Sequence, residues 1–278
     1  MYRALMSRGV LVVAIALYVI ASPFAQESDP KLTGIDYLLD AYVRDGEVYY
    51  RALKSDRAKL DTYVASLAAA PVAQQPRETQ LAFWLNAYNA LVLRTVIDHY
   101  PIQGHASQYP AKSIRQIPGA FERLPHRVAG RTLTLDQIEK DVLPEFRDPR
   151  VYFALGRGAA GSGRLRSEAF LPARIEEQLA DVASECVTRA QCLSIDREAG
   201  KVNASSIFSW RESDFAAAFA AAAPPAFASR APIERAIIAF VMPKLLPIEK
   251  EMLEKNTFQF VYTPFDWTLN DLTGRGGR

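Results

Sequence analysis

The stretch LAFWLNAYNALVLRTVIDHY, residues 81–100, decides the fold that we expect of this chain. It contains no glycine or proline and Pro101 follows it directly, so the sequence predicts one long helix from about Glu78 to Tyr100. Its apolar side chains fall on almost every side of the helix, and only Arg94 and Asp98 form a narrow polar sector. A helix of this kind is normally buried, so we expect it at the centre of the domain.

Two amides, Asn86 and Asn89, interrupt the apolar surface of this predicted helix. A buried amide that lacks partners costs roughly 1–3 kcal/mol, so both side chains should be hydrogen-bonded to specific groups. They could hold neighbouring loops in place, or they could line a ligand pocket. The sequence leaves both interpretations open, and both residues are therefore candidate binding residues.

The composition is that of an ordinary globular protein, with 49% hydrophobic and 23% charged residues over 278 positions. Lys and Arg total 33 against 31 acidic residues, and residues 1–25 contain Arg3 and Arg8 but no acid. Without this leader the two totals are equal at 31, which is not the basic footprint of a nucleic-acid-binding protein. We therefore expect no nucleic-acid partner.

Residues 1–25 have the pattern of an export signal. The two arginines precede an apolar run from Gly9 to Ala21, and small residues give cleavage points after Ala21 or Ala25. The apolar run is shorter than the roughly 20 residues that a membrane-spanning helix needs. We expect an exported protein, periplasmic or extracellular, with no stable membrane span once the leader is cleaved. The alternative is a protein that its uncleaved leader anchors to the membrane.

The two cysteines, Cys186 and Cys192, lie close together in the sequence. In an exported protein such a pair favours a disulfide, and two reduced, inert thiols are the other interpretation. Neither cysteine has a histidine near it, and two cysteines alone are too few for a metal site. The sequence therefore predicts neither a bound metal ion nor a cofactor.

Apolar periodicity predicts several helices and a few short strands around the central helix. The helices are expected over residues 32–44, 56–69, 134–142, 172–188, 216–223, 233–242 and 243–254. One small sheet is expected from strands near residues 127–133, 151–155, 193–203 and 258–262. Asp56 and Thr134 are the predicted N-caps of their helices. The expected fold is a single, helix-rich, mixed α+β domain over residues 26–272, followed by a disordered tail over residues 273–278.

The apolar run VYFAL, residues 151–155, is expected to be a buried strand that leads into the glycine-rich loop GRGAAGSGR, residues 156–164. Such a loop lets the backbone approach a ligand closely, but a flexible turn has the same composition. The loop lacks the phosphate-binding pattern GxxxxGK[ST]. Ser162 lacks the glycine two residues before it that a nucleophile elbow requires.

Five stretches of the sequence match one known family in the same order. They are AFWLNAYNAL (82–91), VAGRTLTLDQIE (128–139), DPRVYFAL (148–155), SIFSWRESDF (206–215) and FDWTLN (265–270). On these stretches the chain resembles the family called domain of unknown function 547 (DUF547). Many bacterial members of that family look exported, and the resemblance implies a remote likeness to papain-like or transglutaminase-like folds.

The chain departs from its family in the glycine-rich loop. The family pattern is HFAL followed by NCGS-x-SCPxL, an arrangement similar to a thiol-nucleophile cleft. Tyr152 stands in the place of the histidine, Arg157 in that of the first cysteine and Ser162 in that of the second. A thiolate nucleophile needs a cysteine with a nearby base, so we expect thiol chemistry to be missing from this chain.

Two functions follow from these observations. The first is a non-catalytic domain whose degenerate cleft binds a small ligand or a protein partner; Arg157 could hold an anionic group there, or it could simply be solvated. The candidate binding residues are Asn86, Asn89, Tyr152, Arg157 and Ser162. The alternative is a hydrolase or acyl-transfer enzyme that uses Ser162, with His126 as its base if the two lie within about 3 Å. We expect the first function, and hence no enzyme activity.

Overall fold

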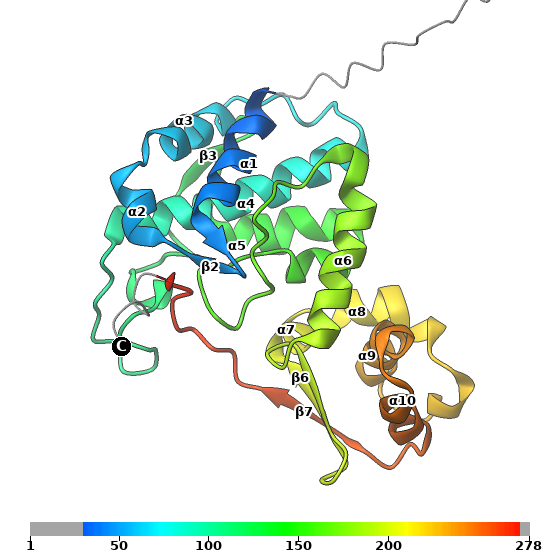
Figure 1. Cartoon of the computed structure of the whole chain (residues 1–278). Coiled ribbons are helices and arrows are strands. Elements are labelled where there is room, and N and C mark those ends of the chain that lie inside the picture. The colour runs from blue at the N-terminus through cyan, green and yellow to red at the C-terminus, as the bar shows by residue number, and fades with distance from the viewer. Residues whose placement is uncertain (1–29, 273–278) are drawn as a thin grey trace, which may run out of the picture.

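Helix α4 (Arg77–His99) runs through the middle of the molecule, as the sequence predicts. The structure is a computed structural model that describes residues 30–272 (Figure 1). Side chains from Leu81 to Ile97 are mostly buried, whereas Arg94 and Asp98 are partly exposed and form an ion pair of 3.0 Å. The predicted polar sector is therefore confirmed, and the remaining surface of α4 contributes to the core.

The predicted leader, residues 1–25, and the predicted tail, residues 273–278, lie outside the described residues. Between residues 30 and 272, none of the helices combines the length and the hydropathy needed to span a bilayer.

The other helices pack around α4 or form a second group near the C-terminus (Figure 1). They are α1 (Pro30–Tyr42), α2 (Tyr50–Ser55), α3 (Ala58–Leu67), α5 (Leu135–Gln137), α6 (Ile175–Thr188), α7 (Ser206–Trp210), α8 (Glu212–Phe219), α9 (Pro232–Val241) and α10 (Pro247–Glu254). Short 3-10 turns are η1 (Ile114–Gln116), η3 (Leu143–Phe146), η4 (Pro149–Phe153), η5 (Pro172–Arg174), η6 (Ala220–Ala222), η7 (Pro225–Phe227) and η8 (Met242–Lys244); η2 (Ile138–Val142) is a π-helical turn. One continuous cluster of buried apolar side chains joins both groups, so the fold is a single helix-rich α+β domain.

Within residues 30–272 the strands form three separate sheets, so the prediction of one small sheet is wrong. The pairs are β1 (Val43–Arg44) with β2 (Glu47–Val48), β3 (His126–Val128) with β4 (Arg131–Leu133), and β5 (Leu193–Asp196) with β6 (Lys201–Ser205) and β7 (Gln259–Thr263). In the third sheet, β7 runs parallel to β6. The predicted strand regions near residues 127–133 and 193–203 are each an antiparallel pair, β3 with β4 and β5 with β6.

The strand predicted over residues 151–155 is also wrong, because this segment contains the 3-10 turn η4. Pro149 occupies its first position, and Asp148 caps the turn by accepting a hydrogen bond of 3.1 Å from the Arg150 N–H. The residues are still buried: the Phe153 ring lies 5.0 Å from that of Phe208. A short apolar run indicates burial equally well in either conformation.

Of the two predicted helix caps, one is confirmed and one is wrong. Thr134 caps α5 and forms a reciprocal capping box with Gln137. Asp56 lies at the C-terminal end of α2, and α3 begins at Ala58 without a side-chain cap. The Asp56 carboxylate instead accepts a hydrogen bond of 2.8 Å from the Tyr42 hydroxyl. Asp56 therefore stabilises a contact with α1 and does not cap α3.

After β7 the chain crosses back to the helices around α4 (Figure 1). Asn270 fixes this return: its C=O accepts from the Val48 N–H at 2.8 Å, and its Oδ1 accepts from the Tyr50 hydroxyl at 2.8 Å. The return places residues 265–270 against the glycine-rich loop.

Candidate functional site

The two buried amides of α4 hold the segments that flank the glycine-rich loop. The Asn86 side chain accepts from the Phe170 N–H at 2.9 Å and donates to the Phe170 C=O at 2.8 Å. The Asn89 side chain accepts from the Gly156 N–H at 2.8 Å and donates to the Ala154 C=O at 3.1 Å. Each amide therefore satisfies two buried backbone groups, and the expectation that both have specific partners is confirmed.

The glycine-rich loop is packed rather than open. The C-terminal segment holds it through Ala160 N–H to Thr268 C=O and Gly161 N–H to Asp266 C=O, both 2.8 Å. A Cβ placed on Gly163 would lie 1.7 Å from the Phe153 carbonyl oxygen. Glycine is thus required here because backbone meets backbone.

Arg157 points inward and is only 2% exposed, so neither a solvated guanidinium nor an open anion site is present at this position. Its Nη2 and Nε donate to the two carboxylate oxygens of Glu139 at 2.7 and 3.1 Å. Its Nη1 donates to the Tyr152 C=O at 3.0 Å. The Tyr88 hydroxyl donates to Glu139 Oε2 at 3.1 Å. The anion that Arg157 holds is therefore a carboxylate of the chain itself.

This ion pair keeps both charges in the core. Burial alone would raise the pKa of Glu139, but the charge and hydrogen bonds of Arg157 and the Tyr88 hydroxyl outweigh it and lower that pKa. Burial would likewise lower the pKa of Arg157, and the charge of Glu139 raises it instead. Glu139 lies in the π-helical turn η2, an irregularity that is common at functional positions.

Tyr152 links this ion pair to a cavity. Its ring is buried, its hydroxyl donates to Asp214 Oδ2 at 2.9 Å, and the hydroxyl also accepts a hydrogen bond from Arg211. The Arg211 guanidinium lies over the Tyr152 ring at 4.2 Å. Burial raises the pKa of Tyr152 even though Arg211 opposes the shift.

A cavity of about 420 Å³ opens beside these groups. Its lining consists of Pro144, Arg147, Asp148, Pro149, Tyr152, Asp214, Ala217 and Ala218. Tyr152 therefore faces a hollow whose other polar side chains come from α8 and from the turn between η3 and η4.

Ser162 lies on the other side of the loop. Its Oγ accepts a hydrogen bond of 3.0 Å from the Arg157 N–H. It lines a hollow of only about 30 Å³ beside the Cys186–Cys192 disulfide, together with Arg164 and Glu185. The structure thus contains the predicted disulfide between Cys186 and Cys192. The hollow has room for about one water molecule, too little for an acyl substrate.

His126 lies in a different cavity from Ser162. It begins β3 and lines a hollow of about 320 Å³ with Arg94, Asp98 and His99. Its Nε2 is buried and has no hydrogen-bond partner among residues 30–272. Burial lowers its pKa, with Asp98 opposing and Arg94 reinforcing the shift. The structure does not bring the candidate nucleophile and its candidate base together in one hollow.

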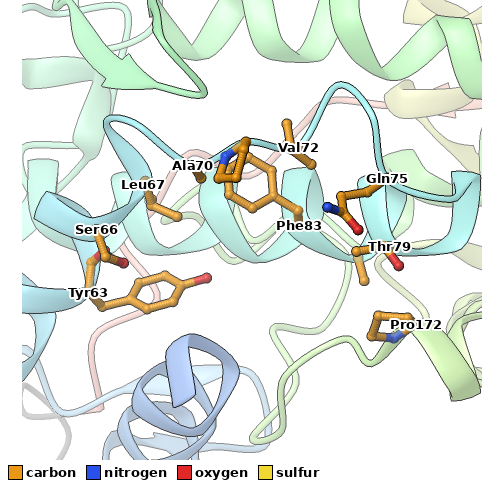
Figure 2. A pocket seen from close by; sticks show the side chains of 11 residues that line it. Tyr63, Ser66, Leu67, Ala70, Val72, Gln75, Thr79, Phe83 and Pro172 are labelled. Atoms are coloured by element: carbon orange, nitrogen blue, oxygen red, sulfur yellow. The ribbon is translucent and has the colours of Figure 1, made fainter. Parts of the chain in front are cut away.

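A further pocket, of about 220 Å³, separates the end of α3 from the start of α4 (Figure 2). Tyr63 and Phe83 point into it from the two helices, and Val72 and Gln75 close it from the connecting loop (Figure 2). The lining is mainly apolar and contains none of the residues that the sequence marked as binding candidates. The sequence of this pocket's connecting loop, residues 71–76, begins and ends with proline, which indicates a turn more readily than a pocket.

Sequence reasoning also missed Glu139, Arg211 and Asp214 as site residues. They are separated in the sequence, Glu139 from Arg211 and Asp214 by about 70 positions, and no local pattern predicts that they meet around Tyr152 and Arg157. Within residues 30–272, His, Cys, Asp and Glu side chains nowhere gather in a group of three or more that could hold a metal ion.

Residues 72–187 match the profile of the family described as "Protein of unknown function, DUF547", so this segment is a DUF547 domain. The segment contains α4, Glu139 and the glycine-rich loop, whereas Arg211, Asp214 and residues 265–270 lie beyond it. No curated protein and no solved structure shows significant similarity to the chain.

Proposed function

We propose that this protein is an exported DUF547 member that binds a small polar ligand without catalysing a reaction. One observation carries the proposal. The side chains at the family's first cysteine and histidine positions, Arg157 and Tyr152, have their polar atoms engaged by other groups of the same chain. A nucleophile and its base must be available to the substrate, and these groups are not.

The cavity beside Tyr152 is the binding site in this proposal. At about 420 Å³ it is within the size range of small-molecule sites. Asp148 and Asp214 are ion-paired with Arg150 and Arg211, so their carboxylates offer a ligand only the lone pairs that these partners leave. Arg147 offers an exposed guanidinium. Pro149 and two alanines of α8 supply apolar wall. These groups suit a small, hydrogen-bonding ligand that carries an amine, alone or together with an anionic group.

The remaining candidate residues act by shaping this cavity. Arg157 fixes the carbonyl of Tyr152, and Asn89 fixes the backbone on both sides of Leu155. Asn86 holds the far end of the loop region at Phe170. Ser162 accepts from the backbone of Arg157 and thereby holds the loop closed. Export is supported by the leader pattern and by the disulfide.

The proposal is tested by a serine probe and by a ligand screen. A fluorophosphonate should label wild type and Ser162→Ala equally weakly, because no histidine lines the hollow that contains Ser162. Thermal shift against amino acids, polyamines and small amino sugars should find ligands that stabilise the wild type. Asp214→Asn should weaken such a ligand by roughly tenfold, the worth of one hydrogen bond to a charged group. Tyr152→Phe should weaken it as well, because it removes the hydrogen bond that orients the Asp214 carboxylate.

The matched control is Ser66→Ala in the apolar pocket, which should bind the ligand as the wild type does. Labelling that disappears in Ser162→Ala would overturn the non-catalytic assignment. Ligands that bind Tyr152→Phe and Asp214→Asn at wild-type strength would overturn the placement of the site.

A further inference from the structure

Strand β7 forms an open edge of its sheet. The strand order is β5, β6, β7, and within residues 30–272 no other strand pairs with the outer side of β7 (Figure 1). An edge strand presents a row of backbone N–H and C=O groups that can pair with another chain.

The backbone groups that face outward can be assigned. The Gln259 N–H donates to the Gly200 C=O at 2.9 Å, so Gln259 turns its backbone toward the β6 hairpin. In a parallel ladder successive residues alternate in the side to which their N–H and C=O point. The N–H and C=O of Phe260 and Tyr262 therefore point outward.

Pro264 directly follows this edge and Arg230 occupies the Phe258 C=O directly before it, so only residues 259–263 are open to pairing. The sequence of these residues, QFVYT, contains no charge and no proline, and Val261 and Tyr262 are 38% and 37% exposed. Natural edge strands are usually blunted by charge, proline or a bulge. The opposite edge of the same sheet, β5, ends on Asp196. The β7 edge is thus the one suited to accept a strand.

The strand is complementary to itself. Reversed about Val261, the order polar, aromatic, valine, aromatic, polar is unchanged. An antiparallel pair of two β7 strands would therefore place Phe260 opposite Tyr262 of the second copy, Gln259 opposite Thr263, and Val261 opposite Val261. Aromatic and β-branched cross-strand pairs of this kind are stabilising.

We propose that the protein forms a twofold-symmetric dimer in which two β7 strands pair antiparallel about Val261. The outward N–H and C=O groups of Phe260 and Tyr262 then exchange hydrogen bonds across the interface, and Val261 lies on the axis. The two sheets become one sheet of six strands. A closed twofold interface uses the same patch on both copies and leaves no further edge at β7.

The interface has no charged residue of its own, so binding relies on backbone bonds and on two aromatic pairs. Two strands of five residues bury less than the roughly 1,600 Å² of a standard interface. We therefore expect dissociation on the order of micromolar concentrations.

Sedimentation velocity over concentrations from roughly 1 to 300 µM tests the proposal, because this range spans the expected dissociation constant. Wild type should shift from monomer to dimer. Val261→Lys and Val261→Glu should each remain monomeric, since like charges would lie directly opposite on the axis. A mixture of the two variants should dimerise, because a lysine then faces a glutamate. Val261→Thr is the matched uncharged control and should dimerise as the wild type does.

Hydrogen exchange on the wild type keeps the test independent of any folding defect in the variants. Exchange in a peptide spanning residues 258–263 should slow as concentration rises. A wild type that stays monomeric at every concentration would overturn the proposal, and so would a Val261→Lys variant that dimerises normally. Failure of the Lys and Glu mixture to dimerise would overturn the antiparallel register.

Discussion

Arg157 and His126 are both largely buried nitrogen bases, and their surroundings differ in one respect. Each of the three guanidinium nitrogens of Arg157 donates to an oxygen of the chain. The Nε2 of His126 is also buried, yet it has no hydrogen-bond partner among the described residues. Because all its nitrogens are hydrogen-bonded, the Arg157 guanidinium stays charged in the core. His126 Nε2 has no such partner, so burial favours the neutral imidazole and lowers its pKa.

Removing Arg157 should have the largest effect of the changes considered. Arg157→Leu leaves the Glu139 carboxylate buried without its cation, so the free energy of unfolding should fall by about 3–5 kcal/mol. Urea unfolding at neutral pH measures the loss. The protein should also become less stable as pH falls through the depressed pKa of Glu139, because a protonated Glu139 no longer pairs with Arg157.

The control is the double variant Arg157→Leu, Glu139→Leu, which removes both charges. It should recover most of the lost stability, because apolar replacements of similar volume are often neutral for a buried ion pair. A double variant as unstable as the single one would mean that packing or the bond to Tyr152, rather than the uncompensated charge, dominates.

The glycine-rich loop that positions Arg157 should tolerate an added side chain poorly. Gly163→Ala would force a methyl group against the Phe153 carbonyl and should cost about 1–3 kcal/mol. Gly34→Ala in α1 is the matched control. Its nearest neighbour would be 3.9 Å away, so it should be neutral or stabilise by about 0.4–1 kcal/mol. Equal effects in thermal unfolding would show that the loop yields and does not fix Arg157.

The smallest expected effect concerns His126. Its pKa is lower in the folded than in the unfolded chain, where it is about 6.5, so on acidification the unfolded chain binds a proton first. Stability should therefore decrease as pH falls below about 7 and stop decreasing once the folded-state pKa is passed. His126→Gln should show a weaker pH dependence in this range, measured by urea unfolding.

His105, exposed in a loop, serves as the control for that experiment. His105→Gln should keep the wild-type pH dependence. If His126→Gln also keeps the wild-type pH dependence, the His126 imidazole is hydrogen-bonded in solution. It would then resemble Arg157, whose nitrogens all have partners.

Local features of the fold were predictable because they depend on neighbours in sequence. The apolar pattern of residues 81–100 predicts α4, and Thr134 is predictable as the N-cap of α5. The buried amides Asn86 and Asn89 were also recognised. The strand predicted over residues 151–155 is wrong because an apolar run indicates burial but does not determine the backbone conformation.

The position of the central helix could be predicted from the order of its apolar residues, and the family resemblance made Tyr152, Arg157 and Ser162 candidate site residues. The contacts that these side chains make depend on how distant segments fold together. Glu139 reaches Arg157 from a π-helical turn, Asp214 reaches Tyr152 from a helix 62 positions away, and β7 leaves its outer edge open. Periodicity and capping are set by residues a few positions apart, whereas the partner of a buried charge is set by how distant segments pack.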